Sequence, residues 1–250
     1  MPAVTSTTTV IAAVAPLAGR AGAAFYFTPE TVARGKELGL DGYRFYFLGR
    51  GGVLGDVEAR VVASAFGYFE PALLAKMWET AKAVVPPRTA GREYLACAHA
   101  MARTRLDGVH GLEAFCAAAG AVVDAADPTG LSLFAGMLGE PRPQDAPARA
   151  IHLMVQLREL RGSAHLLAVR ASGLSPRVAH YLRRPEDFRL FGWGESDVPA
   201  VGEVERRQLA DADALTDALL APAFDVLDAD GRTALVDGAG AVAAALGTDG

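Results

Sequence analysis

Apolar side chains recur along most of this chain at the three- and four-residue spacing of an α-helix. The spacing is clear in residues 71–85, where Leu74, Met77 and Trp78 fall on one face, as expected of a helix that packs against a core. No run of residues alternates strictly between apolar and polar side chains, as a half-buried strand does. The pattern therefore predicts an all-α, multi-helix protein with little or no sheet.

Residues that favour helix ends set the predicted boundaries. Thr28 can cap a helix that Pro29 opens, because proline is tolerated in the first turn. The glycine-rich residues 49–52 predict a flexible elbow after a short helix. The predicted helices cover residues 10–18, 28–38, 43–48, 56–66, 71–85, 89–105, 109–126, 148–171, 175–183, 204–220 and 232–246, with a further short helix from residue 185.

Three prolines lie close together in residues 139–147, which is typical of a linker. A chain of 250 residues can form one large domain or two small ones. We therefore predict two packed helical halves, an N-terminal domain of residues 1–143 and a C-terminal domain of residues 144–250.

Composition and charge argue against several classes of protein. The two cysteines, Cys97 and Cys116, are too few to cross-link a secreted domain, which favours a reducing cytoplasm. No stretch approaches the roughly 20 apolar residues that cross a bilayer, so no membrane partner is expected. The net charge of −5 argues against nonspecific binding of nucleic acid.

The charge is nevertheless unevenly distributed. Residues 158–189 hold seven arginines and three acids, whereas residues 195–230 hold ten acids and two arginines. The two blocks could neutralise each other, which we favour, or the first could face an anion. The acidic C-terminal helices could also bind a protein partner.

The common catalytic and cofactor motifs are absent. The chain has no GxGxxG after a strand, no Walker loop, and no CxxC, HExxH or GxSxG motif. No two of its five histidines stand three or four residues apart, so no helical face presents a metal-binding pair. We expect no metal and no cofactor.

The segment 156–165 contains the side chains best suited to binding or catalysis. On a helix, Arg158, Arg161 and His165 share one stripe, and Gly162 leaves an open surface between them. Two guanidiniums and an imidazole can bind a carboxylate, sulfate or phosphate, and an imidazole can transfer a proton at neutral pH. The alternative is an exposed stripe paired with Glu159 or with acids of the tail.

Residues 165–184 also read as two helices joined at Gly173-Leu174-Ser175. A DNA-binding interpretation would direct basic side chains of the second helix toward a groove, namely Arg177, His180, Arg183 and Arg184. We favour an ordinary corner between core helices, because the chain is acidic and no wing hairpin follows. DNA binding stays open.

Aromatic residues cluster near the N-terminus, around 25–27 and 43–47. Most would belong to the core. Tyr26 or Glu30 could still face a cavity, as hydrogen-bond anchor or acid–base group, with Arg50 close in sequence.

Two groups of motifs then suggest a family. The first comprises Tyr26-Phe27-Thr28-Pro29-Glu30, Gly39-Leu40, Tyr46-Phe47-Leu48-Gly49-Arg50 and Leu54-Gly55, and the second comprises His152 followed by Leu157-Arg158-Glu159-Leu160-Arg161-Gly162-Ser163-Ala164-His165. Together they resemble an actinobacterial family of helix-turn-helix proteins with motifs of the type YFxPE…GRxxPLG and LREhRGDGHxAAL. The resemblance spans about residues 10–246. It implies a helical, winged-helix-related fold and no known reaction, and it adds His152 to the candidate binding residues.

The chain departs from the family pattern in two places. Ser163-Ala164 stands where the family has Asp-Gly, and the stretch that would form a recognition helix and wing after Trp193 is missing. A relative that keeps its pocket residues but loses its recognition helix and wing suggests a protein that acts on a small molecule in a specialised biosynthetic pathway.

We therefore expect a metal-free enzyme or binding protein for a small anionic metabolite. Arg158 and Arg161 would hold the anion, and His165 or Glu30 would transfer a proton. Tyr26, Arg50 and His152 would line the site. Ring closure, elimination or isomerisation would suit such a site, since positioning and acid–base catalysis suffice for each. The alternatives are a ligand-responsive helix-turn-helix regulator and a non-catalytic partner subunit of a biosynthetic enzyme.

Overall fold

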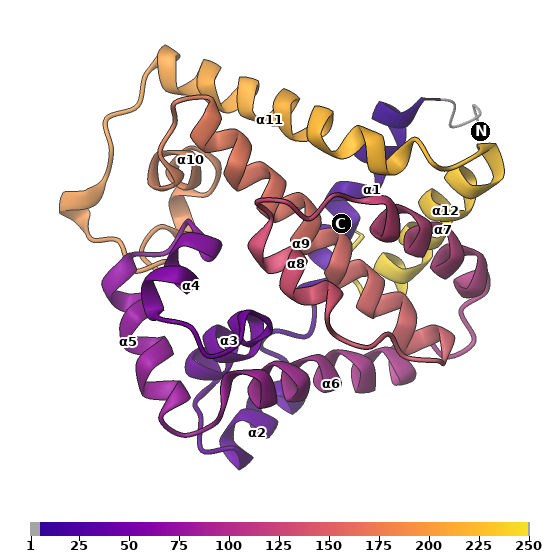
Figure 1. Ribbon diagram of the computed structural model, residues 1–250, viewed down its shortest axis with the longest axis horizontal. Helices are drawn as coiled ribbons and strands as arrows, with labels where there is room; N and C mark the ends of the chain where they lie inside the picture. Colours follow the sequence, from indigo (N-terminus) through magenta and orange to yellow (C-terminus); the bar gives the residue numbers. More distant parts are fainter. Residues whose placement is uncertain (1–5, 250) are drawn as a thin grey trace.

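The computed structural model describes residues 6–249, and all regular secondary structure in this part of the chain is helical (Figure 1). The all-α, multi-helix prediction is confirmed. The helices are α1 (Thr7–Ala21), α2 (Pro29–Glu37), α3 (Gly42–Gly51), η1 (Gly52–Leu54), α4 (Ala59–Phe66), α5 (Pro71–Lys82), α6 (Pro87–Arg105), α7 (Leu112–Ala125), α8 (Ser132–Leu138), α9 (Ala146–Ala171), α10 (Pro176–Arg183), η2 (Pro185–Asp187), η3 (Glu195–Asp197), α11 (Glu203–Phe224) and α12 (Ala229–Ala245).

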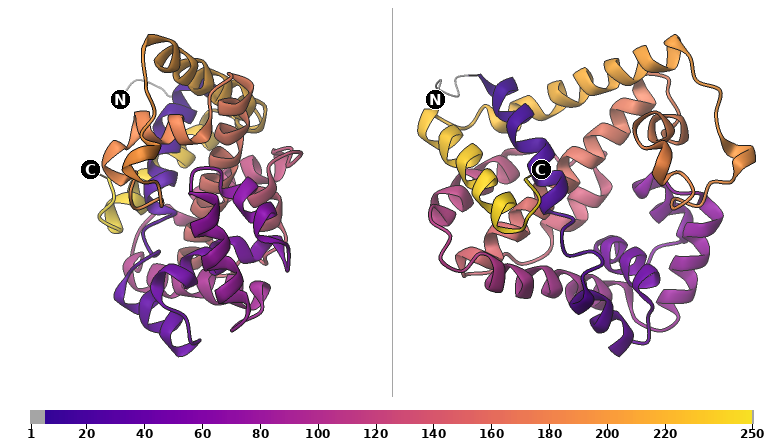
Figure 2. Two further views of the ribbon diagram at one scale, coloured as in Figure 1. Left: turned by 90° about the vertical axis from the view of Figure 1, so that its left-hand side faces the viewer. Right: turned by 180° about the vertical axis from the view of Figure 1, so that it is seen from behind.

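Helix α9 is the centre of the molecule. It contacts α1, α6, α7, α8, α10, α11 and α12, and α8 and α1 cover it on opposite faces (Figures 1 and 2). Most of its residues are buried, including polar ones such as His152, Gln156 and Glu159. Because α9 is buried over most of its length, its buried polar side chains need partners inside the protein.

One hydrophobic core joins residues from both sides of position 143. It includes Phe45 of α3, Phe115 of α7, Leu153 of α9 and Leu235 of α12. A second, smaller core lies where α9, α10 and α11 meet. The division into residues 1–143 and 144–250 remains a prediction.

The glycines at the end of α3 are not a flexible elbow, and that interpretation was wrong. Helix α3 continues through Gly49 to Gly51 and packs directly on α6. A Cβ at Gly49 would lie 2.5 Å from Cγ of Tyr94, and one at Gly52 only 2.1 Å from the carbonyl oxygen of Pro87. The glycines are therefore required for close helix packing.

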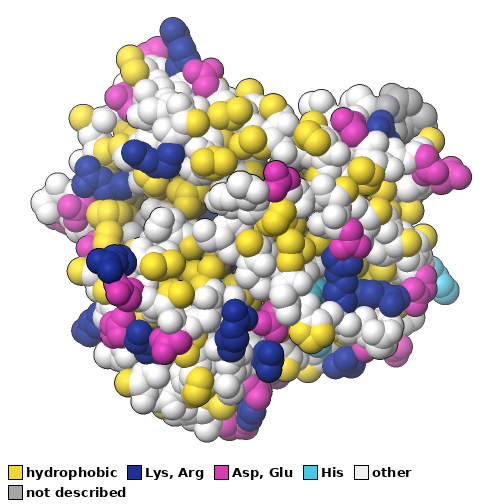
Figure 3. Space-filling view, viewed as in Figure 1, with side chains coloured by type: hydrophobic (Ala, Val, Ile, Leu, Met, Phe, Trp, Pro, Cys, Tyr) yellow, Lys and Arg dark blue, Asp and Glu magenta, His cyan; other side chains and the backbone are white. Residues whose placement is uncertain are grey.

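Helix α8 was not predicted from the sequence. Its seven residues bury Leu133, Phe134 and Met137 against α9 and η1. A helix of two turns shows too few repeats to reveal its periodicity. Figure 3 shows apolar side chains over α8 and α9 on the face of the molecule that Figure 1 presents.

The described residues 6–249 include no helix long and apolar enough to cross a membrane. Between α10 and α11 the chain crosses the α4–α5 turn, with the backbone NH of Glu70 donating to the Phe191 carbonyl at 2.8 Å. The indole Nε1 of Trp193 also donates to the carbonyl of Tyr68 at 2.9 Å. This crossing holds the α4–α5 turn close to α10.

Candidate functional site

A buried carboxylate between two arginines lies where α3 meets α9. Arg50, in the last turn of α3, donates two hydrogen bonds of 2.9 Å from Nε and Nη2 to the two oxygens of Glu159. Arg158 donates a third bond of 2.6 Å from Nη1 to Oε1. Glu159 is only 2% exposed. The close packing of α3 on α6 places Arg50 within reach of α9.

Charge keeps this group ionised in spite of its burial. Burial alone would raise the pKa of the Glu159 carboxyl, but the Arg50 and Arg158 guanidiniums outweigh it and hold that pKa below its usual value. Burial would likewise lower the pKa of Arg50, and Glu159 reverses the shift. The carboxylate accepts three hydrogen bonds from these arginines, out of about four that its two oxygens can accept. Two guanidiniums against one carboxylate leave a positive charge.

Tyr26, in the turn between α1 and α2, lies beside this group. The Arg158 guanidinium carbon stands 5.1 Å from the centre of its ring. The Tyr26 hydroxyl is buried, and no hydrogen-bond partner for it exists in the described part of the chain. Burial raises the pKa of this hydroxyl, against the opposing effect of Arg158 and Arg50. The phenol is therefore a neutral donor without an acceptor.

A second tyrosine, Tyr68, also has a buried hydroxyl without a partner in the described residues, and it follows Phe66 in the chain. The Arg50 guanidinium carbon lies 4.5 Å from the centre of the Phe66 ring, and the NH of Tyr68 donates to the Phe66 carbonyl at 2.9 Å. Burial raises the pKa of Tyr68 to about 12, while Arg161, Arg183 and Arg50 oppose the rise.

Arg161 completes the group. No hydrogen bond or ion pair of its guanidinium is found within the described residues, although its charge influences both Tyr68 and His165. The neighbouring Gly162 faces open space, since a Cβ there would meet nothing within 4 Å. We call Tyr26, Arg50, Tyr68, Arg158, Glu159 and Arg161 the arginine–tyrosine cluster.

The enclosed space beside the cluster is narrow. A slot of about 20 Å³ is lined by Tyr26, Arg50 and Glu159 together with apolar residues that include Phe25 and Tyr94. That volume holds a single water molecule. A larger ligand would have to bind toward the open surface at Gly162.

The structure separates His165 from Arg158, although both lie on α9. The imidazole of His165 is buried against α11, with Nδ1 3.0 Å from Oγ1 of Thr216 and 3.8 Å from a carboxylate oxygen of Asp213. Burial, and then Arg161 and Arg183, lower the pKa of His165 to about 4. The imidazole is thus neutral at physiological pH.

Glu30 and His152 lie away from the cluster. Glu30 is exposed in the first turn of α2, and no contact described for residues 6–249 joins it to Arg50, Arg158 or Tyr26. The catalytic roles of His165 and Glu30 remain predictions.

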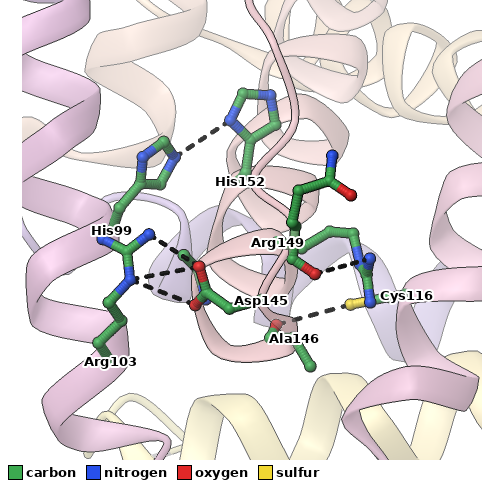
Figure 4. Close-up of polar contacts among 9 residues, drawn as sticks. His99, Arg103, Cys116, Asp145, Ala146, Arg149 and His152 are labelled. Carbon is green, nitrogen blue, oxygen red and sulfur yellow. Dashed lines mark hydrogen bonds and ion pairs between the residues drawn. The ribbon is translucent and has the colours of Figure 1, made fainter.

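His152 is fully buried and pairs with His99 of α6, whose Nε2 lies 3.2 Å from its Nδ1 (Figure 4). Burial, followed by His99 and Arg142, lowers the pKa of His152 to about 3. His99 and His152 are 53 residues apart, so no spacing rule could have paired them. The role of His152 as a binding residue also stays a prediction.

The helix-turn-helix corner is present as α9, a turn at Gly173 with φ +78°, and α10, which Ser175 caps. Each of three arginines from the corner has an acidic partner. Arg183 pairs with Asp213 of α11, Arg177 lies 3.8 Å from Asp197, and Arg184 lies 3.8 Å from Asp187. The positive charge of α10 is therefore largely neutralised within the protein.

Sequence reasoning missed Glu159 and Tyr68 as members of the site. Glu159 was considered only as a surface partner for the arginines, and an acid between Arg158 and Arg161 does not reveal from the sequence that it is buried. Nothing in the sequence around Tyr68 separates it from core aromatics. Within residues 6–249, no group of three or more His, Cys, Asp or Glu side chains is arranged to hold a metal ion.

Comparison with known proteins gives one result. A family model described as Helix-turn-helix family matches residues 11–250. No curated protein and no solved structure matches the chain significantly. The family match includes every residue of the arginine–tyrosine cluster.

Proposed function

We propose that this chain, which belongs to the helix-turn-helix family, binds a small anionic molecule at the arginine–tyrosine cluster. The observation that carries the proposal is a surplus of hydrogen-bond donors over acceptors. Glu159 already accepts three hydrogen bonds from Arg50 and Arg158. The Tyr26 and Tyr68 hydroxyls and the Arg161 guanidinium remain without acceptors in the described structure.

An unpaired buried donor costs free energy, of the order of 1–3 kcal/mol. Two such hydroxyls beside a positively charged group favour a ligand rich in acceptor oxygens, because one anion can satisfy several donors at once. Guanidiniums bind carboxylates and phosphates through strong charge-assisted bonds. The cluster offers these donors at the meeting point of α3, α9 and the turns that carry the two tyrosines.

Thermal unfolding in the presence of acetate, benzoate, inorganic phosphate and succinate tests the proposal. A ligand that binds only the folded state raises the melting temperature, and Arg161→Ala should remove most of that rise. Arg105→Ala is the matched control, because Arg105 is an exposed arginine in the last turn of α6. Circular dichroism first establishes that both variants fold. The proposal fails when no anion stabilises the protein, or when both variants respond equally.

A second candidate function is DNA binding by the α9–α10 corner, which the family match favours. The acidic partners of Arg177 and Arg183 count against it, because a phosphate backbone would have to compete with Asp197 and Asp213. Gel-shift assays at low salt with the promoter of the chain's own gene test this function. A shift of the DNA that is lost in the Arg177→Ala and Arg183→Ala variants would support DNA binding. Unshifted DNA would exclude this function.

A further inference from the structure

We infer that residues 185–197, between α10 and α11, form an internal cover over the face of α10 that would meet DNA, and that duplex DNA binds α10 by displacing this cover. We call these residues the cover segment, which runs from η2 to η3 (Figure 1). The inference rests on the second candidate function, DNA binding by the α9–α10 corner, and adds how that binding is controlled.

The contacts of the cover segment lie on one face of α10. Their spacing of three and four residues places the side chains next to one another on a helix. The face consists of Arg177, His180, Tyr181 and the C-cap residue Arg184. The ring centre of Phe191 lies 4.0 Å from that of His180, and the ring centre of Phe188 lies 5.2 Å from that of Tyr181. Aromatic rings of the cover segment therefore cover the middle of the face.

Charged contacts close both ends of the same face. At the first turn, the Arg177 guanidinium carbon lies 5.6 Å from the centre of the Trp193 ring, and Nη1 of Arg177 lies 3.8 Å from a carboxylate oxygen of Asp197. At the far end, Nη1 of Arg184 lies 3.8 Å from a carboxylate oxygen of Asp187. Two acids thus stand beside the arginines that would bind DNA phosphates.

The other side of α10 faces the interior of the protein. Ala179 belongs to the small core shared with α9 and α11, and Arg183 pairs with Asp213 of α11. A recognition helix lies in the major groove and directs one face toward the DNA. Because α9 and α11 occupy the inner side, the covered face is the one that α10 could direct toward a groove.

The cover segment is also fastened to the α4–α5 turn. The Glu70 NH donates to the Phe191 carbonyl, the Trp193 indole donates to the Tyr68 carbonyl, and the ring centres of Phe69 and Phe191 lie 4.1 Å apart. These contacts keep the segment on α10 when no DNA is bound. The alternative is a permanent part of the fold that DNA never displaces.

Displacement is favoured by the exposure of the charged contacts. The side chains of Arg177 and Arg184 are 40% and 65% exposed, so DNA phosphates reach them while the cover segment is still in place. Exposed ion pairs contribute little free energy. A polyanion that releases counterions competes with such pairs strongly at low salt.

Fluorescence anisotropy of the full-length chain, with a labelled duplex of the promoter of its own gene at low salt, tests the inference. In the Asp187→Asn/Asp197→Asn double variant, both acids beside the arginines lose their charge and keep their shape. We expect this variant to bind the duplex about tenfold more tightly than the parent protein, which should bind weakly.

The matched control is the Glu186→Gln/Glu195→Gln double variant, which changes the charge of the cover segment by the same amount. Glu195 pairs with Arg189 within the segment, Glu186 is exposed, and neither acid has an ion pair with α10 among residues 6–249. This variant should bind the duplex within about threefold of the parent protein.

Hydrogen exchange gives an independent readout of displacement. The hydrogen bond from the Glu70 amide to the Phe191 carbonyl is lost when Phe191 leaves His180. Saturating duplex should therefore speed exchange of the Glu70 amide in the parent protein. The Leu106 amide, which donates to a carbonyl at the end of α6, should be unaffected.

The outcomes separate the inference from the function on which it rests. Equal gains in DNA affinity by the two double variants would assign the effect to bulk charge. DNA binding by the parent protein as tight as by the Asp187→Asn/Asp197→Asn variant, or without faster exchange at Glu70, would show a permanent cover. Each of these results overturns the inference and leaves the second candidate function standing. If neither the parent protein nor any variant binds the duplex, both fail, and the proposal of anion binding is untouched.

Discussion

The imidazole of His165 on α9 and the hydroxyl of Thr216 on α11 lie within hydrogen-bonding distance, with Nδ1 3.0 Å from Oγ1. The hydroxyl hydrogen of Thr216 is already used, because it donates to the Ala212 carbonyl at 2.6 Å. Thr216 must therefore accept from His165, which fixes the imidazole proton on Nδ1. Any proton that His165 accepts must enter at Nε2.

This relationship predicts the tautomer of His165. Nitrogen-detected NMR at pH 7 should show a neutral ring with the proton on Nδ1, and Thr216→Val should lose that preference. The same variant should lower the free energy of unfolding by about 1–3 kcal/mol, because it leaves a buried donor unpaired. A ring protonated on Nε2 in the parent protein would contradict the assignment.

Stability should fall as the pH drops below 6.5. Burial, as the largest effect in each case, lowers the pKa of His99 to about 4, of His152 to about 3 and of His165 to about 4. The unfolded chain then binds more protons than the folded chain below pH 6.5, which favours unfolding. The free energy of unfolding should be constant above that pH and should fall by up to about 1.4 kcal/mol per pH unit for each histidine below it.

Urea unfolding between pH 7.5 and 5 measures this slope, in a range where carboxylates titrate little. His152→Asn should reduce the slope even where it lowers stability at every pH. His110→Asn, at an exposed histidine, should leave the slope unchanged. A flat profile in the parent protein would contradict the burial argument.

Glu159→Gln should be strongly destabilising. The amide keeps the shape of the side chain but removes the charge that offsets the buried Arg50 guanidinium. Loss of one partner from a buried ion pair costs about 3–5 kcal/mol. Glu58→Gln is the matched control, because the Glu58–Arg60 pair is exposed and should contribute less than about 1 kcal/mol. Equal unfolding midpoints in urea for the two variants would rule out a structural role for the cluster.

Gly52→Ala should destabilise the protein by about 1–3 kcal/mol or more, because overpacking forces the backbone apart. The added Cβ would lie 2.1 Å from the Pro87 carbonyl oxygen, which belongs to the backbone and cannot rotate away. Gly19→Ala is the control, since a Cβ there meets nothing within 4 Å, and it should stabilise α1 by about 0.5–1 kcal/mol. Thermal unfolding compares the two, and a stable Gly52→Ala variant would restore the elbow interpretation.

The sequence predicted most helices because their starts are chemically distinct. Thr28 and Ser175 each cap the helix that follows, and both caps form in the structure. Glycine was ambiguous, since the same residue type permits a bend or a close contact. Only the neighbour across the interface, Tyr94 at Gly49, decides between the two.

The site was harder to predict because most of α9 is buried. Helical periodicity placed Arg158 and His165 on one stripe, but a stripe does not say which elements cover it. The turn that carries Tyr26 covers the first position, and α11 covers the second. These contacts depend on tertiary packing, which residue spacing along one helix does not encode.

The central position of α9 has a consequence for biosynthesis of the chain. Its 26 residues, about 39 Å of helix, provide the surface on which α1, α6, α7 and α8 pack. When the first 145 residues have left the ribosome, these helices still lack that surface, so their apolar sides remain accessible to chaperones. Closure of the core must wait until α9 emerges, which makes the early nascent chain the stage most exposed to aggregation.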